Sequence, residues 1–490
     1  MSKTILTIDE YRSLETRAGN MLGHDALMLR AGTAAADFIA ERIPAGGRVT
    51  LLVGPGNNGG DALVAALELK KRGFATTVVL PGGRQPKSEL AKRFFAEWCE
   101  AGGAVTDDPY LTEKADCVVD GLFGMGQTKP VAGDDLDAVL WFNERRGLKV
   151  SLDVPTGLNP YTGRWIGPRP GCRADATLTF LATKAGFYME EGVDAAGEIH
   201  LFELDVSIPL STLSVVEEDE FPHVLHRRAQ NVHKGDFGRL VVTGGARGTF
   251  GAAILAARAA LTMGAGLVTV DALAEDIPAF DPLEPALMFA VEKPDYSKFD
   301  VTVLGPGLGR SEAARARVKE ALETAHALVL DADALNIIAE DLPLQDLLLS
   351  RREPTVLTPH AMEAARLLRR DVKDVTVDRV AAARELAVQT GAIVVLKGPG
   401  TVTTLRSSRA WINPTGSAML ATAGTGDVLA GMIGAMFAQK FDMVEATLSA
   451  VWLHGRAGEL LAQEMTAYCA SPRELVTRGL GLTFRELLEA

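Results

Sequence analysis

Residues 48–69 read RVTLLVGPGNNGGDALVAALEL, and this stretch decides the fold of the first part of the chain. An unbroken apolar run ends in a glycine-rich turn, after which Ala, Leu and Val recur as in a helix. Continuous apolar runs are typical of strands that are covered on both faces of a parallel sheet. Glycine lets the main chain approach a ligand, and the free N–H groups at a helix start attract anions. The stretch therefore predicts a strand, a possible anion-binding turn and a helix.

The same alternation extends on both sides of this stretch. A helix is expected at residues 25–43, and further strands are expected at 75–81, 116–124, 149–155, 176–182 and 198–205. Helices between such strands predict right-handed crossovers and a parallel sheet. Residues 211–224 carry an acidic cluster without a clear period, and we interpret them as a linker. The alternation then restarts with expected strands at 239–245, 266–273, 301–307, 327–333, 355–360, 392–398 and 401–405. The sequence thus predicts two α/β domains, 1–210 and 225–490.

The bulk composition narrows the class of protein. With 490 residues, the chain is too long for one ordinary hydrophobic core. A net charge of −13 argues against nucleic acid or an anionic membrane as a partner. The start of the chain lacks the apolar core of a signal peptide, so a cytoplasmic location is expected. Four scattered cysteines without metal spacing predict buried thiols in a reducing compartment: Cys99, Cys117, Cys172 and Cys469.

Two further expected strands of the first domain end in polar residues. VVDGLFGMGQTKP, residues 118–130, contains Asp120, and SLDVPTGLNPYTG, residues 151–163, contains Asp153 and Thr156. Because ligands of open α/β sheets bind at the carboxyl ends of the strands, these ends and the first turn predict one pocket. Asn58, Asp120 and Thr156 offer hard oxygen ligands for an alkali-type cation, and Asp153 is the best candidate for proton transfer. Helix capping is the alternative for each aspartate.

The second domain carries a similar turn in TAGTGDVLAGMIGAMF, residues 422–437. The GTG turn would begin a helix, and its N–H groups would stabilise charge on a phosphoryl group in transfer. Asp427 beside it could accept a proton from a substrate hydroxyl, although an ordinary helix cap is the alternative. In LTPHAMEAARLL, residues 357–368, Thr358 is a candidate N-cap, and His360 lies at the mouth of the expected helix. VVLKGPGTVTTL, residues 394–405, could hold a nucleotide through Lys397 and backbone N–H groups.

The first domain resembles the NAD(P)H-hydrate epimerase family, in GPGNNGGD (54–61), DGLFGMG (120–126) and DVPTG (153–157). The resemblance covers roughly residues 1–210 and implies a Rossmann-like three-layer sandwich, interconversion of the R and S hydrates, and a bound K⁺ held by Asn58, Asp120 and Thr156. Asp153 would contact the substrate at the reacting end, and Lys184 would meet a phosphate or shuttle a proton. The substrate would be lined by Asn57, Asn58, Gly59, Gly60, Asp61, Gly124, Met125, Gly126, Gln127, Thr128, Lys129 and Pro130. The chain departs from the family pattern at Ala62, Thr156 and Gln127, where Gly, Ser and Leu are usual.

The second domain resembles the ribokinase-like superfamily, and more closely the ADP-dependent NAD(P)H-hydrate dehydratases. The resemblance lies in TGGARGTFGAA (243–253), GPGLG (305–309), DADALN (331–336) and GTGDVLAG (424–431). It implies that ADP or ATP, with Mg²⁺, drives dehydration of the S hydrate through phosphorylation of its hydroxyl and loss of phosphate. Phe250 stands where Tyr is common. By the resemblance, Ala253, Gly309, His360 and Asp427 would contact the hydrate, and Lys397, Gly398, Pro399, Gly400, Thr401 and Gly426 the nucleotide.

Together the two resemblances predict a bifunctional enzyme that repairs hydrated NAD(P)H, with a homo-oligomer as the family's habit. One alternative is a kinase of a small, vitamin-like alcohol fused to a Rossmann-like nucleotide-binding module, because a fold does not fix a substrate. Another is a nucleotide-binding sensor without catalysis. Retention of Asp153 and Asp427 among polar loops argues against the sensor.

Overall fold

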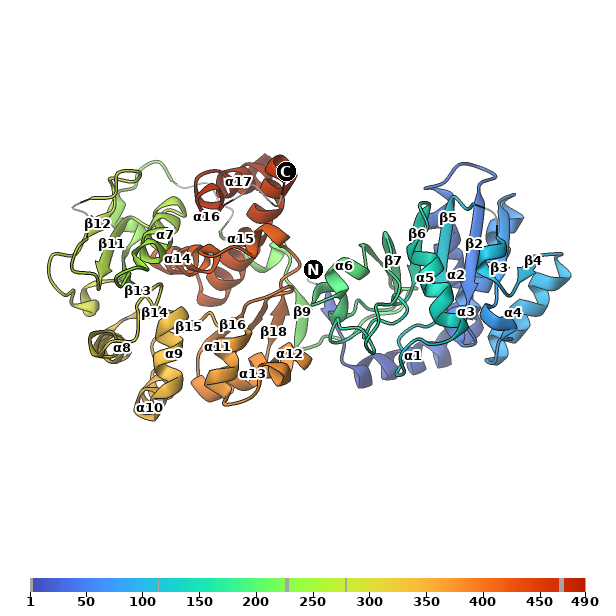
Figure 1. The fold of residues 1–490 in the computed structure, drawn as a ribbon, viewed down its shortest axis with the longest axis horizontal. Helices are drawn as coiled ribbons and strands as arrows, with labels where there is room; N and C mark the ends of the chain where they lie inside the picture. Colours follow the sequence, from blue (N-terminus) through green and yellow to red (C-terminus); the bar gives the residue numbers. More distant parts are fainter. Residues whose placement is uncertain (1–2, 113, 225–228, 278–279, 467–470, 490) are drawn as a thin grey trace. The chain divides into compact units, whose positions relative to one another are not determined.

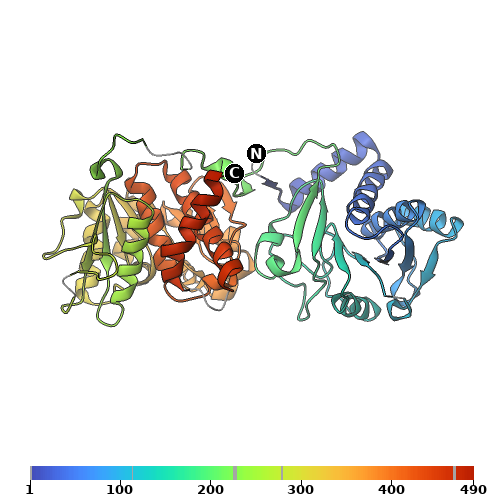
Figure 2. The ribbon, with the colours of Figure 1, turned by 90° about the horizontal axis from the view of Figure 1, so that it is seen from above.

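The structure, a computed structural model, describes residues 3–112, 114–224, 229–277, 280–466 and 471–489. The chain divides into two compact units, one formed by Lys3–Ser211 and one that begins at Thr212. Figures 1 and 2 show each unit as a sheet with helices packed on it. No helix within the described ranges combines the length and the apolar character needed to cross a membrane.

The N-terminal unit is built on a parallel sheet with the strand order β4-β3-β2-β5-β6-β7-β8. Apolar residues of α2, α3 and α4 cover one face of this sheet, and α5 covers the other. A short strand, β1, and helix α1 precede these elements, and α1 packs near the end of β7. The strands are β1 (Thr4–Ile5), β2 (Arg48–Val53), β3 (Ala75–Val79), β4 (Ala104–Thr106), β5 (Cys117–Gly121), β6 (Leu148–Leu152), β7 (Ala176–Phe180) and β8 (Glu198–Phe202). The helices are α1 (Ile8–Leu22), α2 (His24–Ala40), α3 (Asn57–Lys71), α4 (Glu89–Glu100), α5 (Asp134–Asn143) and α6 (Gly192–Ala195).

The C-terminal unit contains a larger mixed sheet, with the order β9-β18-β17-β16-β15-β14-β13-β10-β11-β12. Only the β16–β17 and β17–β18 pairs among these strands are antiparallel. The strands are β9 (Leu213–Val215), β10 (Arg239–Gly244), β11 (Leu267–Ala272), β12 (Met288–Phe289), β13 (Val301–Leu304), β14 (Ala327–Leu330), β15 (Thr355–Leu357), β16 (Ile393–Leu396), β17 (Val402–Thr404) and β18 (Ala410–Ile412).

Helices cover both faces of this second sheet, with α7, α14 and α15 on one side and α8, α9, α11 and α13 on the other (Figure 1). The helices are α7 (Phe250–Thr262), α8 (Glu312–Thr324), α9 (Ala332–Glu340), α10 (Leu342–Ser350), α11 (Ala361–Leu368), α12 (Val372–Val377), α13 (Arg379–Thr390), α14 (Thr425–Ala438), α15 (Met443–Met465), α16 (Pro472–Glu474) and α17 (Leu480–Glu489).

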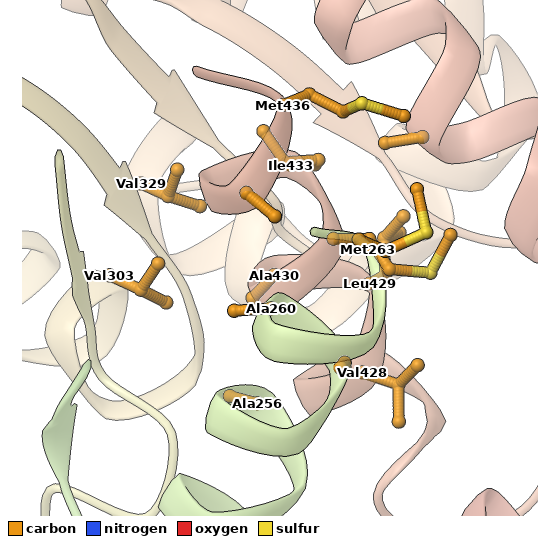
Figure 3. Close-up of a cluster of buried hydrophobic side chains, with 14 of the residues drawn as sticks. Ala256, Ala260, Met263, Val303, Val329, Val428, Leu429, Ala430, Ile433 and Met436 are labelled. Atoms are coloured by element: carbon orange, nitrogen blue, oxygen red, sulfur yellow. The ribbon is translucent and has the colours of Figure 1, made fainter. Parts of the chain in front are cut away.

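The contact between α7 and α14 depends on small residues. A Cβ atom placed on Gly431 would lie 2.0 Å from the carbonyl oxygen of Ala256, and one on Gly434 would lie 2.5 Å from a methyl group of Val303. The absence of these side chains lets α14 touch the backbone of α7 and the sheet beneath it. Val428, Ala430 and the other apolar residues around this contact are buried (Figure 3). The packing fixes the N-terminal end of α14 relative to the sheet.

The predicted fold class is confirmed, but several elements were not predicted. The sequence did not predict α1, β1, β4, β12 and β18, each of which is short or at an edge except α1. Within the expected linker 211–224, Leu213–Val215 forms β9, which pairs in parallel with β18.

The expectation of buried thiols holds for only part of the chain. Cys117 and Cys172 are buried, whereas Cys99 is exposed, so the prediction is wrong for Cys99. Cys99 lies in the last turn of α4, on the solvent side of that helix. Cys469 lies outside the described residues.

Candidate active sites

A cavity of about 570 Å³ lies where the strand order of the N-terminal sheet reverses, at the carboxyl ends of β2 and β5. This is the position at which open α/β sheets bind ligands. The loops after β2, β5 and β6 supply one part of its wall, and α1 and α2 supply another. The predicted residues that line it are Asn57, Asn58, Asp61, Gly124, Met125, Gly126, Gln127, Thr128 and Asp153.

Close backbone contact explains the glycines of the first turn. A Cβ atom on Gly54 would lie 1.7 Å from the carbonyl oxygen of Leu122, and one on Gly59 would lie 2.0 Å from that of Gly54. One on Gly60 would lie 2.6 Å from the end of Met28. Gly59 and Gly60 are therefore buried in packing contacts and do not line the cavity, which differs from their predicted role.

Asp153 reaches the cavity from a strained position. Its φ angle is +61°, a region that residues other than glycine rarely adopt. One carboxylate oxygen accepts a hydrogen bond from the Nζ of Lys184 at 2.7 Å, and the other accepts one from the N–H of Met125 at 3.1 Å. Two donors, one of them charged, therefore orient the carboxyl group of Asp153 at the cavity.

Lys184 lies behind Asp153 and is only 2% exposed. Its ammonium group also donates to Thr179 Oγ1 at 2.6 Å and to the carbonyl of Phe180 at 3.1 Å. Burial lowers the pKa of Lys184, and the charge of Asp153 opposes that effect. Because Lys184 does not line the cavity, the structure does not support direct contact with a substrate phosphate.

The three predicted cation ligands gather around the loop after β5. Asp120 is fully buried and accepts hydrogen bonds from Thr156 Oγ1 at 2.7 Å and from Ser151 Oγ at 3.0 Å. Burial raises the pKa of Asp120, and these donors oppose the shift. The side-chain amide of Asn58 is buried, and neither its oxygen nor its nitrogen has a partner within the described residues. An unpaired amide oxygen beside hydroxyl and carboxylate oxygens suits an alkali cation.

The loop at residues 124–130 is anchored through Gln127. Its side-chain oxygen accepts a hydrogen bond from the N–H of Gly157 at 2.8 Å, and its side-chain nitrogen donates to the carbonyl of Lys129 at 3.0 Å. Gln127 thus ties the loop to the DVPTG turn, a contact that Leu could not make. Lys129 and Pro130 are exposed and do not line the cavity.

Helix α1 supplies cavity residues that sequence reasoning missed. Tyr11, Arg12 and Glu15 line the cavity from this helix, and Thr7 and Glu10 form a capping box at its start. The Thr-x-x-Glu spacing is a recognisable signal for a helix start. Nothing local in the sequence indicates that this helix packs beside strand ends that come more than a hundred residues later.

The C-terminal sheet also reverses its strand order, between β10 and β13, and the loops that follow these strands touch. The N–H of Gly245 donates to the carbonyl of Pro306 at 2.9 Å, and a Cβ atom on Gly244 would lie 2.1 Å from the same oxygen. Gly309 lies at the end of the second loop, where its N–H donates to Asp333 at 2.8 Å. Ala253 is fully buried beneath Gly244 and Gly245, so its side chain does not reach the site, which differs from its predicted role.

Asp427 occupies the first turn of α14, which begins at Thr425 after Gly424, as predicted. Within the described residues, the side chain of Asp427 accepts no capping hydrogen bond from the N–H groups at the start of α14, so Asp427 does not cap the helix. Burial, and then the negative charge of Asp331, raise the pKa of Asp427 to about 7, against the effect of Lys397. A carboxyl group in this range changes its charge near neutral pH, which suits a general base.

Lys397 joins two sides of this site. Its Nζ lies 2.7 Å from Asp331, which is 1% exposed, and 3.3 Å from the position that a Cβ of Gly426 would take. Burial disfavours the charged form of Lys397, but Asp331, Glu363 and Asp427 outweigh it and raise its pKa. The ammonium group therefore stays charged at the mouth of α14.

His360 is the N-cap of α11. Its Nδ1 accepts from the N–H of Met362 at 3.1 Å, and Glu363 completes the capping box. Burial, and then Lys397, lower the pKa of His360. The prediction that Thr358 caps this helix is wrong, because its hydroxyl donates to Asp331 at 2.8 Å.

The loop at residues 397–401 is fixed from below by Arg379, which is 4% exposed. The guanidinium donates to the carbonyl of Leu396 at 2.9 Å and to that of Pro399. Thr401 Oγ1 closes the loop by donating to the carbonyl of Gly398 at 3.1 Å. The predicted nucleotide residues Lys397, Gly398, Pro399, Gly400 and Thr401 thus form one preorganised turn next to Gly426.

The chain matches known proteins over both units. Residues 24–186 match the family model described as YjeF-related protein N-terminus, and residues 240–478 match the model described as NAD(P)H-hydrate dehydratase. The bifunctional NAD(P)H-hydrate repair enzyme Nnr of Coxiella burnetii is 36% identical, with 89% of this chain and 90% of the relative covered. That of Escherichia coli is 34% identical, with 94% and 90% covered. A ribokinase-like superfamily protein of Enterococcus faecalis has a solved structure with a TM-score of 0.50 and 28% identity, which covers 58% of this chain and 99% of that one.

The chain is a two-unit α/β enzyme, and each unit has a glycine-lined helix start and a carboxylate beside a lysine. The C-terminal unit has the ribokinase-like fold. The chain belongs to the family of bifunctional NAD(P)H-hydrate repair enzymes.

Proposed function

We propose that this chain repairs hydrated NAD(P)H in two steps, with epimerisation at the cavity of Lys3–Ser211 and nucleotide-driven dehydration of the S form in the unit that begins at Thr212. One observation carries the proposal most directly. Each unit holds an aspartate that does not cap a helix, Asp153 in the first and Asp427 in the second. Each aspartate lies near a lysine and a glycine-lined turn, at the position where sheets of this type bind ligands.

In the dehydration step, Asp427 would accept the proton of the substrate hydroxyl as that oxygen attacks a nucleotide phosphate. The N–H groups of the α14 start and the charge of Lys397 would stabilise the phosphoryl group in transfer. The turn 397–401 would hold the nucleotide, with ADP as the favoured form, and Mg²⁺ would neutralise its phosphates. Phosphate then leaves more easily than hydroxide, and that difference makes the elimination feasible.

In the epimerisation step, Asp153 would move a proton at the reacting end of the hydrate. Asn58, Asp120 and Thr156 would hold K⁺, which would fix the loops of residues 120–126 and 153–157 beside the substrate. The unpaired buried amide of Asn58 supports this assignment. We place the reaction in the cytoplasm and expect the enzyme to act on small molecules and to assemble as a homo-oligomer.

The test supplies the purified chain with each hydrate epimer separately, with ADP and Mg²⁺, and follows the return of nicotinamide absorbance. Both epimers should be converted. Conversion of S alone would leave the dehydratase and remove the epimerase. A stable phosphorylated product would indicate a small-molecule kinase, and no reaction with either epimer would reject the proposal.

A further inference from the structure

A second carboxyl group, that of Asp61, faces the cavity of the N-terminal unit. Asp61 is the fifth residue of α3, and Gly56 is the N-cap, so Asp61 lies beyond the first turn and does not cap the helix. Within the described part of the chain, its side chain has neither a hydrogen-bond donor nor a cationic partner. The carboxyl group of Asp61 therefore faces the cavity and makes no contact among those residues that stabilises the fold.

Asp61, on α3, and Asp153, after β6, both line this cavity and have different environments. Asp153 accepts hydrogen bonds from an ammonium group and an N–H. Burial, followed by the negative charges of Asp153 and Glu15, raises the pKa of Asp61 well above its usual value. A carboxyl group that retains its proton, next to a second carboxyl group paired with an ammonium group, is an arrangement suited to an acid and a base.

The remaining titratable groups around Asp61 are less suited to proton donation. Burial, and then Asp153, also raise the pKa of Glu15, but Glu15 is an exposed residue of α1 that solvent reaches. Lys184 is buried behind Asp153. Tyr11 has a pKa raised by burial. The other titratable groups that line the cavity are Arg12 of α1, His24 of α2 and Tyr161 of the loop after β6.

We infer that Asp61 is the general acid of the epimerisation and works with Asp153 as the base, so that one proton is shared between two cavity carboxyl groups. This inference rests on the proposed epimerase function. In a hydrated dihydropyridine ring, the hydroxyl lies on a carbon next to the ring nitrogen. Asp61 gives its proton to that hydroxyl, the C–O bond breaks with its electron pair on oxygen, and the nitrogen lone pair forms a C=N⁺ bond.

Water then adds to the opposite face of the same carbon. A new C–O bond forms, the C=N pair returns to nitrogen, and Asp153 takes the proton released by the water. The ring is neither oxidised nor reduced, and one proton has moved from Asp61 to Asp153. The reverse epimerisation begins from this state, with the proton on Asp153. Before another forward turnover, proton exchange with solvent protonates Asp61 and deprotonates Asp153.

The experiment incubates the full chain with each epimer in ¹⁸O-labelled water, without nucleotide, and measures epimerisation and entry of label into the hydroxyl. In the native chain, label should enter with each epimerisation, because the oxygen comes from solvent. In Asp61→Asn, kcat for epimerisation and label entry should both fall about 10²–10⁴-fold, the usual range for loss of an acid–base group. Glu68→Gln is the control, because Glu68 lies on the same helix but pairs with Lys71 outside the cavity.

Each outcome decides between the claims. No epimerisation by the native chain rejects the epimerase function itself. Epimerisation without label entry, or an Asp61→Asn variant within about threefold of the native kcat at saturating hydrate, overturns the role of Asp61 and leaves the epimerase function standing. If Asp61→Asn does not fold, the native pH profile decides, because kcat should fall as pH rises through the raised pKa of Asp61. A profile without that fall overturns the inference.

Discussion

Asp153 and Asp427 both lie beside a glycine-rich turn and a largely buried lysine, yet they differ in how they meet that lysine. Asp153 pairs directly with Lys184 at 2.7 Å. In the second unit, Lys397 pairs with Asp331 at the same distance, and Asp427 forms no ion pair within the described residues. Burial, and then the charge of Asp331, raise the pKa of Asp427 to about 7. The lysine of the first site thus contacts the proton-transfer group itself, whereas the lysine of the second site contacts a neighbouring aspartate.

Asp427→Asn should have the largest effect. Removal of the base should reduce ADP-dependent dehydration of the S hydrate about 10²–10⁴-fold, because the amide cannot accept the hydroxyl proton. Turnover is followed by nicotinamide absorbance, and ADP binding is followed by calorimetry. Binding should persist and epimerisation should be unchanged. Turnover near the native rate would contradict the assignment of the base.

Asp153→Asn should stop epimerisation to a similar extent, about 10²–10⁴-fold, and leave dehydration of the S hydrate intact. The physical reason is that the variant removes the carboxyl group that Lys184 orients at the cavity, and an amide cannot take the proton. The two epimers are separated by chromatography over time. A parallel loss of dehydration would show that the two units do not work independently.

Lys184→Met removes the charge of Lys184 but keeps a side chain of similar length. Without the ammonium group, the buried side of Asp153 loses its counter-charge, and we expect a loss of stability of about 3 kcal/mol. Because Asp153 also loses a hydrogen-bond donor that orients it, kcat for epimerisation should fall, whereas dehydration of the S hydrate should be unchanged. The measurements are thermal unfolding and kcat for both reactions. A destabilised variant with the native kcat for epimerisation would indicate a purely structural role.

The pH profile of dehydration sharpens the comparison without a mutation. The pKa of Asp427 lies at about 7, and its active form as a base is the ionised one. The kcat/KM for dehydration should therefore be low below this pH, rise through about pH 7 and level off above it. Asp427→Glu offers a control, because a longer carboxylate in a different position should shift or weaken this limb. If the rise in kcat/KM near pH 7 is unchanged in Asp427→Glu, the rise belongs to the titration of another group.

Gln127→Leu should have the smallest effect. It introduces the residue that is usual in the family but removes the hydrogen bond to the N–H of Gly157. One such bond contributes about 0.5–1.5 kcal/mol, so KM for the hydrate should rise by no more than about tenfold, with kcat unchanged. Gln127→Glu keeps the acceptor and serves as the matched control. Equal KM values in the native chain and both variants would show that Gln127 does not hold the loop in the position that binds the hydrate.

The sequence predicted the parts of the structure that depend on local pattern. The strand that ends before Gly54, the strand that ends at Gly121 and the helix start at Thr425 follow from apolar runs and glycine turns, and the structure has them. The position of α1 could not be predicted in this way, because its place beside β7 depends on contacts such as that of Tyr11 with Phe180. The short strands β4, β12 and β18 carry too few residues for a period to be visible.

The sites were predicted as sets of residues but not as networks. The family resemblance implied that Lys184 meets a phosphate or shuttles a proton, and the structure places it behind Asp153, away from the cavity lining. The resemblance assigned Ala253 to the hydrate, and its side chain is buried. Asp331 lay within the DADALN motif without a role, although it pairs with Lys397. Such pairings join residues 66 positions apart, as Asp331 and Lys397 are, and spacing in sequence does not reveal them.

The glycines of α14 have a consequence for the order in which the second site is assembled. A helix interior with Gly431 and Gly434 is intrinsically weak, since each glycine costs about 1 kcal/mol relative to alanine. We expect α14 to gain its stability only after α7 and the strand of Val303 are in place to receive it. A chain that is still folding, or one opened locally at this contact, would then lack the helix start that carries Asp427. Nucleotide turnover would therefore appear only once this unit is fully folded.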